Sequence, residues 1–96
     1  MNLQNATDEL IHHLHAGNPS MQISGNRRRV KVAGHDGLVT NMASNSPFGG
    51  PETDVLLTVA RPEGLFYMIF IAPQQEFRNL QAVFDQMVSS IRFNNS

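Results

Sequence analysis

The most regular hydrophobic pattern of the chain lies in its last third. Residues 65–72 are apolar or aromatic at every position, which is typical of a strand that is buried on both faces. After Pro73, apolar side chains recur at spacings of three, four, three and four, at Phe77, Leu80, Phe84, Met87 and Ile91. This spacing predicts an amphipathic helix over residues 75–91 with one buried stripe. We therefore expect a strand, a proline turn and a helix that packs across the sheet.

The first two thirds of the chain predict another helix and three more strands. Leu3, Ala6, Leu10 and Leu14 recur at helical spacing, which predicts a helix over residues 5–16. Asn5 or Thr7 is expected to cap its start, and Gly17 and Pro19 to end it. Residues 20–26 are interpreted as a connector or short extended piece. Strands are expected at residues 28–33, 38–45 and 53–61, with turns at residues 34–37, 46–51 and 62–64.

Together these elements predict one α+β domain over residues 1–96. Its expected architecture is a four-stranded antiparallel meander with an N-terminal helix and a long C-terminal helix packed on the sheet, because short connections favour antiparallel neighbours. The strand at residues 65–72 has two apolar faces, and the C-terminal helix covers one of them. The other face needs the first helix, another part of a longer chain, or a partner.

Composition narrows the functional classes. The formal net charge is −1 and charged residues make up 16 % of the chain, below the ~25 % of an average domain. The charge balance gives no support for nucleic-acid or membrane-surface binding, and no run approaches the length of a membrane span. With no cysteine, a disulfide, a zinc–thiolate site and a thiol nucleophile are excluded. The low charge indicates that part of the surface meets another protein.

The histidines are the weak candidates for a metal site. His12 and His15 are three residues apart on the predicted first helix, so their imidazoles can share a helix face. A structural zinc site needs about four ligands, and no well-spaced acid completes the set. A solvated helix face is the simpler interpretation, and no cofactor is indicated.

Two segments are candidates for a binding surface. Arg27, Arg28 and Arg29 form the main charge cluster, although strand alternation sends neighbouring side chains to opposite faces. The loop at residues 44–52 contains Phe48 between two prolines and the pair Gly49–Gly50. It lacks the Lys-Ser or Lys-Thr and the following helix of a phosphate-binding loop. We expect Phe48, Gly49 and Gly50, and more weakly the arginines, to contact a protein.

No catalytic residues are predicted. The acidic residues at the centre and end of the chain are scattered over turns, strand ends and the helix surface, and no pair has the spacing of an acid–base dyad. No Gly-x-Ser-x-Gly elbow and no His-Glu-x-x-His motif occurs. An enzyme that acts alone is therefore not expected.

Several segments resemble a known family. They are Ser46–Gly50, Thr58–Tyr67, Ile71–Pro73 and the closing pattern F-x-x-M-x-x-S-I-R-F at residues 84–93. Together they resemble the C-terminal accessory domain of bacterial zinc metallopeptidases of the prenyl-protease type, which has the PsbP/Mog superfold. The catalytic metal motif of that family lies in a separate upstream domain and is not in these residues. In that superfold further strands precede the first helix, so the resemblance implies a C-terminal fragment of a larger domain.

The resemblance implies a non-catalytic accessory or protein-interaction domain of a cell-envelope or periplasmic peptidase. Its partner would be the parent peptidase domain or its substrate, and exposed sheet edges would favour a homodimer. Two alternatives remain open at this stage. One is a free-standing small-ligand-binding or self-associating module, and the other is a metal-responsive protein that uses His12 and His15.

Overall fold

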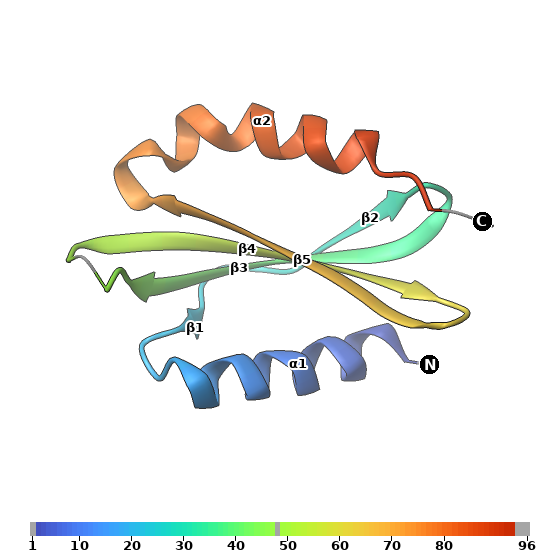
Figure 1. Ribbon diagram of the computed structural model, residues 1–96, viewed down its shortest axis with the longest axis horizontal. Coiled ribbons are helices and arrows are strands. Elements are labelled where there is room, and N and C mark those ends of the chain that lie inside the picture. The colour runs from blue at the N-terminus through green and yellow to red at the C-terminus, as the bar shows by residue number, and fades with distance from the viewer. Residues whose placement is uncertain (1, 48, 94–96) are drawn as a thin grey trace.

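The computed structural model describes residues 2–47 and 49–93 (Figure 1). The elements along the chain are α1 (Leu3–Gly17), β1 (Gln22–Ile23), β2 (Arg28–Val32), β3 (His35–Asn45), β4 (Pro51–Arg61), β5 (Gly64–Pro73), the 3₁₀ turn η1 (Gln74–Glu76) and α2 (Phe77–Ser90). This is the expected α+β class with a helix at each end of the chain. No helix in the described ranges is both long enough and apolar enough to cross a membrane.

The sheet is antiparallel throughout and has the order β1–β3–β4–β5, with β2 also paired to β3. β2 to β5 form the predicted meander. The predicted four strands become five, because part of the expected connector, Gln22–Ile23, pairs with Met42 and Ala43 of β3. β1 and β2 lie along the same side of β3, so β5 forms the opposite edge of the sheet.

Each face of the sheet carries one helix, α2 on one side and α1 on the other (Figure 1). Under α2 the buried core consists of Val32, Val39, Val55, Leu57, Val59 and Phe84. Under α1 it consists of Met21, Met42 and Leu56, with Leu10, Ile11 and Leu14 of the helix packed on them. Of the three possible covers considered for the second face of the sheet, the first helix is the one observed.

The buried stripe of α2 differs from the prediction at one position. Phe84 is 1 % exposed and Val88 packs against the same core, whereas Met87 is 38 % exposed. A helix turns by about 100° per residue, so Val88 lies about 40° from Phe84 and Met87 about 60° away on the other side. The spacing predicted the helix correctly, but it wrongly included Met87 among the buried residues.

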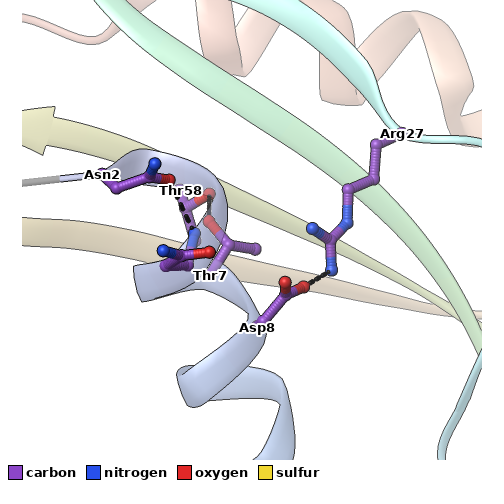
Figure 2. A network of polar contacts seen from close by, with 6 residues as sticks. Asn2, Thr7, Asp8, Arg27 and Thr58 are labelled. Atoms are coloured by element: carbon purple, nitrogen blue, oxygen red, sulfur yellow. Dashed lines mark hydrogen bonds and ion pairs between the residues drawn. The ribbon is translucent and has the colours of Figure 1, made fainter.

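α1 begins earlier than expected and binds the sheet through a polar contact. Asn2 caps the helix, because its side chain accepts a hydrogen bond from the Asn5 backbone N–H at 2.9 Å. Thr7, an expected cap, is instead fully buried, and its hydroxyl lies 2.7 Å from that of Thr58 on β4 (Figure 2). The side chain of Arg27, which precedes β2, reaches α1 and pairs with Asp8 (Figure 2).

The turn between β2 and β3 consists of Ala33 and Gly34, so it begins one residue before the predicted 34–37 turn, and His35 to Gly37 belong to β3. Ala33 and Gly34 have φ values of 51° and 84°, the left-handed conformation that a two-residue hairpin turn requires. Gly37 lies inside β3, where a Cβ would come within 3.1 Å of the Thr58 carbonyl oxygen and of Val30 Cγ2. The glycine therefore serves close packing and not the turn.

The residues after α2 close one end of the core. The Phe93 ring lies 5.1 Å from that of Phe66 and 5.6 Å from that of His35, between ring centroids. The Arg61 guanidinium stands 4.0 Å above the same ring, a favourable cation–π geometry. These contacts hold the end of α2 against the turns of the meander.

Candidate interaction edge

β5 is a long strand with an open side. Its ten residues, Gly64–Pro73, contain no charged side chain, and one side of the strand pairs along its whole length with β4. Among residues 2–47 and 49–93, no strand pairs with the other side. Natural edge strands are usually protected by charges, bulges or shortness. β5 has no charge and is not short.

Exposed apolar side chains lie beside this strand on the face that carries α1. Tyr67 and Ile71 are 51 % and 57 % exposed. In the register they stand opposite Thr58 and Asp54 of β4, which lie on the same face of the strand as Leu56, a core residue under α1. The helix covers the centre of this face and leaves the outermost strand partly open.

Two more exposed apolar residues lie above β5 on the other face. Val83 and Met87 are one helical turn apart on α2 and are both exposed. The opposite flank of α2, with Asp85 and Ser89, borders a groove against β2. Because β5 is the strand farthest from β2, Val83 and Met87 are on the flank directed towards β5. We call β5 together with Tyr67, Ile71, Val83 and Met87 the β5 edge.

The opposite edge of the sheet has a different character. β2 carries Arg28, Arg29 and Lys31 within five residues. β1, which shares this edge, is two residues long and exposes Ile23. A charged short strand is a poor template for another strand. The two edges therefore differ in the feature that controls strand addition.

A buried carboxyl group lies in the sheet next to the β5 edge. Asp54 is fully buried, and its Oδ2 atom is 2.7 Å from the hydroxyl of Ser44, which is itself 2.8 Å from Glu52 Oε1. A serine hydroxyl has one proton to donate, so one of the two carboxyl groups must supply a second proton. Burial raises the pKa of Asp54, and the nearby Glu52 carboxylate raises it further. Both effects favour the neutral form of Asp54, and the hydrogen bond from the Ser44 hydroxyl to its Oδ2 atom lowers the pKa in part.

This polar group lacks the access that a catalytic site needs. Asp54 is 0 % and Ser44 5 % exposed, so a substrate cannot reach the shared proton. The second oxygen of Asp54, Oδ1, accepts no hydrogen bond from any residue that the structure describes. The arrangement is a buried polar group of the sheet that a substrate does not reach.

The histidines are not brought to a common site. The Nδ1 atom of His15 lies 2.8 Å from the carbonyl oxygen of Met21 and so holds the turn that follows α1. The rings of His12 and His13 pack edge to face, with centroids 6.0 Å apart. In the part of the chain that is described, no three histidine, aspartate or glutamate side chains are grouped to hold a metal ion.

The predicted binding residues lie far from one another. Arg27 pairs with Asp8 of α1, while Arg28 and Arg29 pair in the sheet with Val39 and Leu38, near the start of β3. The 46–50 loop follows the other end of β3, where Gly49 and Gly50 have φ values of 95° and 90°. These two glycines border a hollow against Pro73 and Gln75. Phe48 lies outside the described residues.

The sequence analysis missed the β5 edge, although one signal was present. The absence of charge between Gly64 and Pro73 is visible in the sequence, but it also fits a central strand. The predicted meander makes this segment its last strand, but the sequence does not show which of its side chains stay exposed. The exposure of Val83 and Met87 depends on how α2 is rotated over the sheet.

The fold is similar to that of a solved protein. No protein-family model and no curated protein matches the chain. The structure of a protein of unknown function from Pseudomonas aeruginosa, PA94, described as a putative regulator, superposes with a TM-score of 0.78 at 8 % sequence identity. The match covers 97 % of this chain and 63 % of that one. At this identity the similarity concerns the fold alone.

Proposed function

We propose that this chain is a non-catalytic accessory or protein-interaction domain and that it binds its protein partner through the β5 edge. The observation that carries the proposal is the combination of an uncharged, unpaired strand with exposed apolar side chains on both of its faces. Such a surface is unfavourable in water and is typical of a binding site. A partner would add a strand to β5 and cover the four side chains.

The native context we propose is a cell-envelope zinc metallopeptidase with a PsbP/Mog-like accessory domain. Support comes from the sequence resemblance at residues 46–50, 58–67, 71–73 and 84–93 and from the α+β architecture. The similar protein from Pseudomonas aeruginosa has additional chain beyond the shared fold, which is consistent with these 96 residues forming part of a larger unit. The partner in this context is the peptidase domain or its substrate.

The test begins with the native reading frame upstream of the Met1 codon. We expect it to encode further strands and then a helix with the His-Glu-x-x-His motif. That upstream domain, expressed separately, should bind the 96-residue chain in a calorimetric titration. A frame without the motif would remove the peptidase context.

Variants of the chain then test the surface itself. Ile71→Lys should abolish binding of the upstream domain, because a charge would be buried against an apolar partner. Ile23→Lys is the matched control, because Ile23 has similar exposure, 50 %, on the opposite edge of the sheet. Equal binding by both variants would exclude the β5 edge. Arg28→Ala tests the arginine cluster in the same titration.

A further inference from the structure

We propose that the β5 edge also binds a second copy of this chain, with the two β5 strands antiparallel across a two-fold axis. The proposal deepens the proposed function and rests on it, since it names the chain itself as one partner of the same edge. It is carried by the symmetry of the exposed side chains and by the contrast between the two edges of the sheet.

The geometry of strand pairing decides which surfaces meet. Two antiparallel strands related by a two-fold axis continue one sheet, and the axis stands perpendicular to it, so each face stays on the same side in both copies. The two α2 helices then lie on one face and the two α1 helices on the other. Val83 and Met87 of one copy approach the same residues of the second copy. On the other face, Tyr67 and Ile71 do likewise.

The β5 edge is therefore self-complementary. In an interface with two-fold symmetry, the same patch must fit itself, so a charge near the axis would face a like charge. β5 has none over ten residues. Each face of the strand presents two exposed apolar residues beside it. In the dimer, each pair would be covered by the same pair of residues from the second chain.

The opposite edge shows what would prevent this association. At β2, a two-fold axis would bring Arg28, Arg29 and Lys31 close to the same cations of the second copy, and like charges on adjacent strands repel. The chain thus carries a charged edge that resists pairing and an uncharged edge that permits it. A partner strand for β5 must be apolar on both faces, and β5 is itself such a strand.

Sedimentation equilibrium of the 96-residue chain tests the proposal. We expect a species of twice the 10.7 kDa chain mass at protein concentrations up to about 0.5 mM, which detects even a weak dimer. Ile71→Lys should weaken the dimer by about 100-fold or more, because it removes an apolar contact and places two ammonium groups near one axis. Ile23→Lys should leave the dimer unchanged. Tyr67→Lys provides a second variant if Ile71→Lys fails to fold, which circular dichroism would show.

Hydrogen exchange supplies an independent measurement. Outward amides of an edge strand exchange fast, whereas those of a paired strand are protected. The β5 amides of the wild-type chain should therefore exchange at least tenfold more slowly at high than at low protein concentration. The β2 amides should show no such dependence.

Clear outcomes would overturn the proposal. A wild-type chain that is monomeric over the whole concentration range excludes the dimer, as does association that Ile71→Lys and Ile23→Lys weaken equally. These results can be distinguished from failure of the proposed function. A monomeric chain that still binds the upstream domain, and loses that binding on Ile71→Lys, retains the interaction role and excludes only the second copy.

Discussion

Asp54 places a carboxyl group where water does not reach it, between Met42 and Ile71 in the pairing register. Burial raises its pKa above the usual 3.8. A group whose pKa is higher in the folded than in the unfolded state binds its proton more tightly when folded. The stability that it contributes is therefore present below pH 3.8 and is lost as the pH rises through the folded-state pKa.

We expect Asp54→Asn to remove this loss. Asparagine resembles the neutral carboxyl group in shape and can donate a hydrogen bond to Ser44. Urea unfolding at a series of pH values from 4 to 8, in steps of about one unit, should show a flatter stability profile and higher stability at neutral pH for the variant. Glu9→Gln, at an exposed position of α1, should leave the profile unchanged. A variant less stable than the wild type at neutral pH would contradict the protonated Asp54.

Gly37 provides a second prediction for a single position. Its missing Cβ leaves room for the Thr58 carbonyl oxygen, which belongs to the backbone of the central strand and cannot move aside easily. Gly37→Ala should lower the free energy of unfolding by about 1–2 kcal/mol. Gly17→Ala, where no atom lies within 4 Å, should raise it by about 0.5–1 kcal/mol. Thermal or urea unfolding of both variants measures the difference.

The same two glycines show how far local patterns could predict the structure. Gly17 followed by Pro19 marked the end of the first helix correctly. Residues 34–37 looked like a turn because Asp-Gly pairs are common in turns, yet the two turn residues are Ala33 and Gly34, three positions before Asp36 and Gly37. The reason is non-local, since Gly37 is required by its contact with Thr58, 21 residues later in the sequence.

The two halves of α1 are attached to the sheet differently. The C-terminal half packs through Leu10, Ile11 and Leu14, whereas the N-terminal half has the buried hydroxyl pair of Thr7 and Thr58 and the ion pair of Asp8 with Arg27. The sequence could not predict the hydroxyl pair, because buried helix positions are predicted from apolar spacing and a buried threonine is not part of that pattern.

A double-mutant cycle tests the hydroxyl pair. Thr58→Val leaves the Thr7 hydroxyl buried without its partner and should cost about 1–3 kcal/mol. Thr7→Val should have a similar effect. The double variant should be less destabilised than the sum of the two single variants, because both polar groups are then removed together. Additive effects would show that the two hydroxyls do not interact.

α2 is the element that the sequence predicted best. The stripe from Phe77 to Ile91 predicted its presence and the burial of Phe84, although Val88 and not Met87 completes the buried side. We expect Phe84→Ala to cost about 3–5 kcal/mol of unfolding free energy. Val83→Ala, on the exposed flank, should cost less than about 1 kcal/mol in the monomer. Equal losses in urea unfolding would mean that α2 is rotated differently over the sheet.

For the whole molecule, the dimer proposal links stability to protein concentration. A dimer that dissociates on unfolding is stabilised by mass action. The Tm of the wild-type chain should therefore rise by about 5 °C or more over a 100-fold increase in concentration. The Tm of Ile71→Lys should stay constant, and a constant wild-type value would contradict a dimer. Differential scanning calorimetry at several concentrations measures both.

The architecture as a whole was predictable in its order of elements but not in its exposed surfaces. Short connections fixed the meander, and the two apolar faces of residues 65–72 required two covering layers. A meander makes its last strand, β5, an edge of the sheet. Which side chains stay exposed beside that edge depends on how far α1 and α2 cover it, and no local pattern predicts that. The exposed side chains of the β5 edge therefore became visible only in the structure.

The contact between Thr7 and Thr58 has a consequence for synthesis on the ribosome. The two residues are 51 positions apart, and translation proceeds at about 5–20 residues per second, so α1 waits roughly 3–10 s for β4 to be made. During that time its apolar residues have no sheet to cover. The hairpins of the meander join neighbouring segments and can close as they emerge. The first helix to be synthesised is thus among the last elements to dock.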